Sequence, residues 1–317
     1  MPKGLRITYD DGGPAMEITA GLRCPSFCQN LSEAWDVNQY TINQRVDGSQ
    51  IVVIPRNTVY KLNRGTNLIP TIGMLDGFTV SGNTITMNTW WSDNWNQKKT
   101  FDASIWQILP ASSGRGLLIK DSTDFLSITD ATMSGYCVWR GTVTFTGSWA
   151  TPTTNISRDR YMVFAKWSAD NVTIEFDGSN ILATIDHAGL DQAATVTMQI
   201  AIFASGVSPT PGRGLNIIKG GVCVFSTTRR PFVYRNQTYA PSWSNTDIGE
   251  GMILLGRYGY NSEVYTGWDY LKWAGLIRNG NLVRAGRGRN AASWTSQYSV
   301  VGRRLTSLTI PVIDAIY

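Results

Sequence analysis

Strand–turn–strand patterns recur along this chain and constrain its fold more than any other feature. In three segments, which begin at Thr79, Asn171 and Gly275, alternating apolar and polar residues flank a Gly-Asn, Asp-Gly or Asn-Gly pair. Such pairs suit the tight turns of hairpins, and alternation is typical of a half-buried strand. Helical patterns are few, and Asn30–Tyr40 is the main candidate for a short helix. The sequence therefore predicts an all-β fold with very little helix.

Composition supports this fold class and narrows the function. The 317 residues are 42% hydrophobic but only 16% charged, and they include 12 Trp and 13 Tyr. Globular proteins carry about 25% charged residues, and the polar and aromatic residues that replace them here suit pleated sheets and contact surfaces. No segment reaches the roughly 18 apolar residues of a membrane span, and the N-terminal residues lack the apolar centre of a secretion signal. We therefore expect no membrane insertion, folding in a cytoplasm, and reduced cysteines.

A repeated phrase indicates how the strands are grouped. GRGLLIK begins at Gly114 and GRGLNIIK at Gly212, and a weaker version, KGLRI, begins at Lys3. An apolar, strand-like segment precedes each of the two later phrases, and another ends the sequence. This bracketing predicts tandem β-sandwich or jelly-roll-like modules, each opening on a glycine-led first strand. Their ranges are 1–112 for the N-terminal module, 113–211 for the central module and 212–317 for the C-terminal module.

Positive charge is concentrated in the last third of the chain. The formal net charge is +5, and residues 229–317 contain 11 Lys and Arg against 5 Asp and Glu. These arginines are scattered through strand-like sequence without a nucleic-acid-binding motif, so we expect no nucleic-acid partner. The alternative of an acidic protein partner stays open. The C-terminal module is thus predicted to have a basic, aromatic-rich surface.

Residue types that common catalytic mechanisms need are scarce. His187 is the single histidine in the sequence, and no G-x-S-x-G nucleophile motif is present. Cys24 and Cys28 have a spacing that a metal site can use, but such a site would need distant partners. The sequence therefore predicts no catalytic, cofactor-binding or metal-binding residue. Glycosidic hydrolysis by two carboxylates needs no histidine and stays open as an alternative.

Two aromatic runs are candidates for a binding surface. Residues 88–99 place Trp90, Trp91 and Trp95 among Asn and Asp residues, and flat rings beside hydrogen-bonding groups suit a sugar. Because neighbours on a strand point to opposite faces, one of Trp90 and Trp91 is also a candidate for the core. The second run, residues 257–273, has spaced aromatic residues typical of recognition surfaces. Its candidates for contact with a glycan or partner are Tyr258, Tyr260, Tyr265 and Trp268.

Three stretches of the chain resemble a known protein family. They are MPKGLRITYDDGGPAMEIT, GRGLLIKDSTDFLSITDATMSGYCVWRGTV and GGVCVFSTTRRPFVY. The family consists of β-rich tail proteins, from the tail-tip and tail-fibre region, of lambda-like phages with long, non-contractile tails. The resemblance implies a non-enzymatic structural component of the tail that is assembled in the host cytoplasm and carried in the virion.

Partners follow from the same resemblance. It implies contacts with other tail proteins, such as the tail-tip or central fibre protein, a homo-oligomeric state, and attachment to a host-surface glycan or receptor. Two alternatives stay open. One is a carbohydrate-binding module of the tail that uses exposed Trp residues, and the other is a glycan-degrading tail enzyme.

Overall fold

The computed structural model describes residues 4–19, 22–63, 69–110, 133–295 and 302–317. Strands make up 57% of the structure and helix 1%. The helical part is a turn of 3₁₀ helix, η2 (Arg158–Arg160). Over these ranges no helix is long and apolar enough to cross a membrane. The predicted all-β fold is confirmed.

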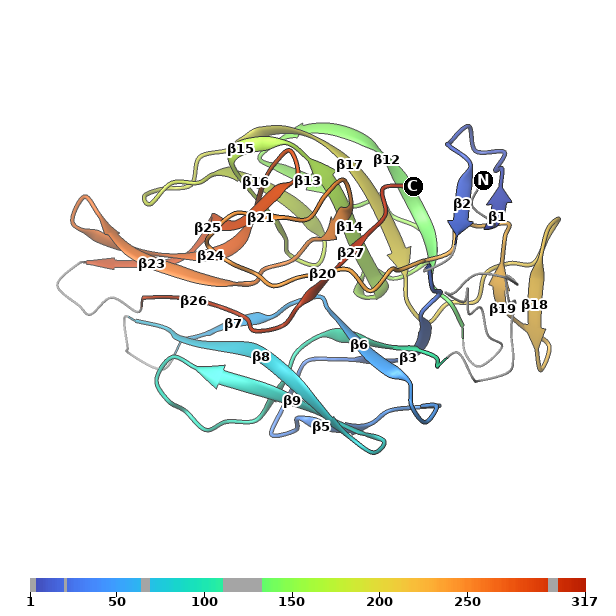
Figure 1. Cartoon of the computed structure of the whole chain (residues 1–317). Coiled ribbons are helices and arrows are strands. Elements are labelled where there is room, and N and C mark those ends of the chain that lie inside the picture. The colour runs from blue at the N-terminus through green and yellow to red at the C-terminus, as the bar shows by residue number, and fades with distance from the viewer. Residues whose placement is uncertain (1–3, 20–21, 64–68, 111–132, 296–301) are drawn as a thin grey trace.

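Two large sheets pack face to face in the upper half of the molecule (Figure 1). The first sheet has the strand order β12 (Tyr136–Thr146), β17 (Thr195–Ala204), β14 (Tyr161–Trp167), β22 (Met252–Leu254), β27 (Ile310–Ile313) and β20 (Thr238–Tyr239). The second runs β13 (Ser148–Ala150), β16 (Asn180–Ile185), β15 (Ala169–Phe176), β24 (Trp268–Asn279), β23 (Gly259–Tyr265) and β26 (Arg303–Leu305). Beside β24 lies β25 (Leu282–Thr295), which also pairs with β21 (Thr246–Asp247). Side chains from both sheets, such as Phe164 and Leu276, share one buried core.

A smaller β unit lies below this sandwich (Figure 1). One of its sheets has the order β3 (Ser26–Leu31), β11 (Ala103–Ile108) and β6 (Gln50–Pro55). The other runs β5 (Gln39–Thr41), β9 (Thr84–Trp91), β8 (Thr71–Ser81) and β7 (Val59–Leu62), and β4 (Ala34–Trp35) pairs with β10 (Lys99–Thr100). Val53 and Ile105 from the first sheet and Leu75 and Ile85 from the second form a separate buried cluster. The ladders of this unit all join strands from within residues 26–108.

Strand pairing does not follow the predicted boundary between the central and C-terminal modules. β14 pairs with β22, and β15 pairs with β24, so both large sheets combine strands from 113–211 and 212–317. Residues 113–211 and 212–317 therefore do not form separate modules. The physical reason is that β22, β27 and β20 cover the edge that β14 would otherwise expose. The predicted boundary at 112/113 lies outside the described residues.

The repeated phrase forms the first strand of a hairpin in the two described copies. β1 (Gly4–Ile7) pairs with β2 (Met16–Thr19), and β18 (Asn216–Lys219) pairs with β19 (Val222–Ser226). Both hairpins lie at the same end of the molecule, on the right in Figure 1. Gly214 has a φ of +136°, and a Cβ there would lie 2.4 Å from Thr227 Oγ1, so this position requires glycine. The copy that begins at Gly114 lies outside the described residues.

The three hairpins predicted from turn pairs are present. β8 and β9 are joined through Gly82-Asn83, and β15 and β16 through residues 177–180. β24 and β25 are joined through Gly280-Asn281, one residue later than predicted, because Asn279 pairs with Leu282. Gly82 and Gly280 have positive φ angles of 50° and 59°, the conformation that such turns demand.

The short helix predicted at residues 30–40 is wrong. This segment contains the end of β3, then β4 and the start of β5. Trp35 pairs with Lys99 on β10, and Asp36 adopts a positive φ of 63° that turns the chain. Pairing with a distant strand has thus overridden the local preference.

Candidate functional site

The first aromatic run lies partly in the core. Trp91 on β9 is only 2% exposed, and its indole Nε1 donates a hydrogen bond to the Gln97 carbonyl oxygen at 2.8 Å. Trp90 points to the other side of β9 and is half-buried. Its ring stacks on Tyr260, with centroids 6.2 Å apart. Trp91 is therefore a core residue, which corrects its prediction as a surface residue; strand alternation turns its ring inward.

Trp35 joins this run in an aromatic cluster at the surface of the smaller unit, which we call the Trp35 cluster: Trp35, Tyr60, Trp91, Trp95 and Lys99. The Trp35 ring stacks on Trp91 at a centroid distance of 5.6 Å and lies 5.8 Å from Trp95. Trp35 is 37% exposed, and Trp95 is half-buried. The cluster therefore presents two indole rings, at least in part, to the surroundings.

A buried lysine, Lys99, stabilises the Trp35 cluster through contacts with its rings. The Lys99 side chain is fully buried, and its Nζ lies 4.1 Å from the Trp35 ring centroid and 4.0 Å from that of Tyr60. Nζ also forms an ion pair with Glu33 at 2.6 Å. Cation–π attraction is strongest where water is excluded, so Lys99 holds the two rings in place. Trp35 and Tyr60 were not predicted from the sequence, because their strands are distant along the chain from residues 88–99, the run that Lys99 ends.

The second aromatic run divides into buried and exposed halves. Tyr258 and Tyr260 are 1% and 2% exposed, which corrects their prediction as surface residues. The physical reason is that Tyr258 packs into the large core, where its hydroxyl donates to the Leu254 carbonyl oxygen at 2.6 Å, and that the Tyr260 ring stacks on Trp90. Tyr265 and Trp268 are 40% and 47% exposed, and they face each other across the end of the hairpin.

The exposed end of this hairpin is continuous with a neighbouring loop. We call it the β23–β24 tip: Leu190, Val264, Tyr265 and Trp268. Leu190 is 69% exposed and Val264 48%. The His187 ring meets the Tyr265 ring edge-on at 4.8 Å, and its Nδ1 accepts a hydrogen bond from the Gly189 N–H at 3.0 Å. The loop 187–191 therefore packs against the hairpin and holds the Tyr265 ring.

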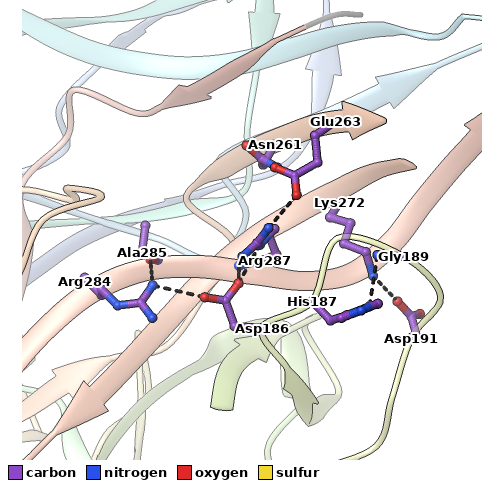
Figure 2. Close-up of polar contacts among 10 residues, drawn as sticks. All are labelled: Asp186, His187, Gly189, Asp191, Asn261, Glu263, Lys272, Arg284, Ala285 and Arg287. Carbon is purple, nitrogen blue, oxygen red and sulfur yellow. Dashed lines mark hydrogen bonds and ion pairs between the residues drawn. The ribbon is translucent and has the colours of Figure 1, made fainter. Parts of the chain in front are cut away.

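An ionic network holds the two parts of the β23–β24 tip, the hairpin and the loop 187–191, in place (Figure 2). Asp186 accepts hydrogen bonds from the Arg287 Nε at 2.7 Å and backbone N–H at 3.0 Å, and from Arg284 at 3.1 Å. A second nitrogen of Arg287 contacts Glu263 on β23. Arg287 thus ties β25 both to the start of the loop and to the hairpin that carries Tyr265.

The charges in this network suit a structural role, in which they hold the loop and the hairpin together, rather than proton transfer. Burial opposes ionisation of Asp186, which is 6% exposed, but hydrogen bonds from Arg287 and Arg284 lower its pKa below the ordinary value. Asp186 and Glu263 line a cavity of about 170 Å³, and both carboxylates are bonded to Arg287. An ionised, paired carboxylate is a poor general acid.

Glu175 is a carboxyl group of this sheet that resembles a catalytic acid in the direction of its pKa shift. Burial raises its pKa, as catalytic acids require. Its side chain, however, is fully buried and accepts hydrogen bonds from Arg257 Nε at 2.9 Å and from the Arg289 backbone N–H. No substrate can reach a group so enclosed without local opening of the sheet. Glu175 is therefore a structural residue.

Cys24, Cys28, Cys137 and Cys223 are buried free thiols, as predicted. Burial raises the pKa of both Cys24 and Cys28 to about 12, so these thiols are neutral and unreactive at neutral pH. Over the described ranges, no group of three His, Cys, Asp or Glu side chains is arranged to hold a metal ion.

Comparison with known proteins gives a family without a described role. A search of curated proteins and a search of solved structures both found no match. Residues 4–296 match the model of a family of unknown function, DUF6453. This match spans most of the chain, and the protein is therefore a member of the DUF6453 family.

Proposed function

We propose that this protein is a non-enzymatic structural and attachment component of a phage tail, located at the tail tip or tail fibre. The observation that carries the proposal is the β23–β24 tip, where Tyr265 and Trp268 stand exposed on a hairpin that an ionic network fixes. The other support is the resemblance of three sequence stretches to tail proteins of lambda-like phages.

The physical argument rests on preorganisation. Large aromatic residues supply most of the binding energy at protein contacts, and they bind best when few side-chain rotations must be frozen. Tyr265 is already held by His187, and Asp186 and Arg287 tie down the backbone on both sides. Exposed Leu190, on the loop that packs against Tyr265, extends the apolar area on that side, and exposed Val264 lies on the opposite face of the hairpin. Such a surface suits a permanent neighbour in the tail or a receptor on the host.

The first test uses the phage that encodes this chain. We expect the protein in purified virions, and we expect the double substitution of Tyr265→Ser with Trp268→Ser to reduce its incorporation or the adsorption of the phage by about tenfold or more. Mass spectrometry of virions and adsorption assays measure the two effects. Leu282→Ser is the matched control, because Leu282 is 41% exposed at the turn after β24. Presence in lysate without any in virions would refute the proposal.

The Trp35 cluster favours a second function, carbohydrate binding within the same particle. The observation that supports this function is the pair of indole rings of Trp35 and Trp95, which lie beside the polar loop residues 92–97. Trp35 is 37% exposed. A sugar ring stacks on an indole face while amides and carboxylates bind its hydroxyl groups. Lys99 keeps the platform rigid from below.

Intrinsic tryptophan fluorescence tests this second function. Titration of the full chain with host surface glycans should give a saturable change, and Trp95→Ala should weaken the apparent affinity by about tenfold, near the loss of one stacking contact. Trp268→Ala, at the other aromatic surface, is the control and should leave the affinity unchanged. A flat titration, or equal affinity in Trp95→Ala, would exclude sugar binding at the cluster.

A further inference from the structure

A cavity of about 660 Å³ lies apart from both aromatic surfaces. Part of its lining comes from the β1–β2 hairpin, which lies with the β18–β19 hairpin at one end of the molecule (Figure 1). Three segments line it: residues 8–11 from the β1–β2 hairpin, residues 137–140 from β12, and residues 227–230 after β19. Arg213 completes the lining. This volume is in the range of small-ligand sites.

Arginine dominates the charge of this cavity. Its lining contains Arg140, Arg213, Arg229 and Arg230 against Asp10 and Asp11, which leaves two positive charges in excess. Arg213 and Arg229 are exposed, and neither forms an ion pair with a described residue. Two guanidinium groups are thus available to an anion in a concave site.

The other two arginines form a rigid base for the cavity. Arg230 is 3% exposed and meets Asp11 through two contacts of 3.0 Å each, while Arg140 Nε lies 3.3 Å from the same carboxylate. The Arg230 guanidinium also lies 4.3 Å from the centroid of the Tyr9 ring. The hydrogen bonds from Arg230, helped by Arg140, hold the pKa of Asp11 well below its ordinary value, so this carboxylate stays charged. The base is preorganised before any ligand arrives.

The remaining lining suits a sugar better than a bare anion. Thr8 is exposed in the wall of the cavity and offers a hydroxyl group for hydrogen bonds to a sugar. Asp10 is exposed and can accept hydrogen bonds from hydroxyl groups. Two carboxylates in the wall would repel a polyphosphate backbone, but one acid group on a sugar needs only Arg213 and Arg229.

We propose that this cavity binds an anionic saccharide, that is, a sugar that carries a carboxylate or a phosphate. The acid group pairs with Arg213 and Arg229, and the hydroxyl groups form hydrogen bonds with Asp10 and Thr8. The site is independent of the proposed tail function and of the Trp35 cluster, because it shares no residue with either surface.

Calorimetric titration of the full chain tests the proposal. The probes are glucuronic acid, glucose 6-phosphate, uncharged glucose and inorganic phosphate. We expect at least one charged sugar to bind saturably, with glucose and inorganic phosphate weaker by about tenfold or more, and the better of the two charged sugars identifies the acid group. Binding should weaken as salt is raised, since the guanidinium groups are exposed.

Variants distinguish the cavity from general charge. Arg213→Gln with Arg229→Gln should abolish saturable binding, and it should leave the fold intact because neither residue pairs within the described structure. Lys98→Gln with Arg160→Gln removes the same charge from exposed positions elsewhere and should change the affinity less than about twofold. Absence of binding by both charged sugars, equal binding in the first variant, or inorganic phosphate binding as tightly as glucose 6-phosphate would each overturn the proposal.

Discussion

Trp106→Ala is expected to lower the free energy of unfolding by about 3–5 kcal/mol, the cost of removing a fully buried large aromatic side chain. Trp106 lies on β11 of the smaller unit and is 0% exposed. Its ring meets Phe27 at 5.4 Å and Phe232, from the C-terminal third of the chain, at 5.5 Å. The substitution would therefore open a cavity where the smaller unit meets the large sandwich.

Denaturant unfolding followed by fluorescence and by circular dichroism measures this loss. Trp268→Ala, which removes an exposed ring, is the matched control and should change the stability by less than about 0.5 kcal/mol. A loss of less than about 1 kcal/mol for Trp106→Ala would contradict its placement in the shared core. Two separate transitions in the variant would indicate that Trp106 couples the two parts.

Arg278→Ala is expected to cost about 3–5 kcal/mol, because it removes a buried side chain together with its charged hydrogen bonds. Arg278 on β24 is 0% exposed. Its guanidinium donates to three carbonyl oxygens: those of Gly280 at 2.8 Å, Gly251 at 2.6 Å and Gly249 at 2.9 Å. The guanidinium thus joins the β24–β25 turn of one sheet to the segment that leads into β22 of the other.

Thermal and denaturant unfolding of three variants separate the contributions to this effect. Arg278→Lys keeps the charge but cannot reach three carbonyls at once, so we expect an intermediate loss. Arg160→Ala removes an exposed arginine and should be near neutral. If Arg278→Ala and Arg160→Ala were equally stable, the buried position of Arg278 would be incorrect.

Local chemistry explains what the sequence could predict. Gly82 and Gly280 mark their turns because few other residues tolerate positive φ, and the alternation on either side follows from the geometry of a strand. The hairpins and the all-β class were therefore predictable from short stretches. The same reasoning failed at Trp35, where a partner strand more than 60 residues away decided the conformation.

Long-range pairing explains what the sequence could not predict. Nothing in the residues of β14 or β15 identifies β22 and β24 as their partners, so the shared sandwich appeared as two modules. The same limit applies to the candidate site. Tyr260 and Tyr265 look alike in the sequence, and only the packing of Tyr260 against Trp90 from the smaller unit distinguishes them. Asp186 and Arg287 meet across 101 positions, and no local pattern links them.

The place of β27 in the six-stranded sheet bears on how this chain is synthesised. β27 lies between β22 and β20, and it comes from residues 310–313, after every other strand of its sheet. After β12, β14 and β17 have been synthesised, more than 100 further residues must follow before the sheet is complete. Until then the nascent sheet carries an open edge, and such edges aggregate. The yield of folded protein is therefore expected to depend on how long this edge stays open during synthesis, as well as on the stability of the finished core.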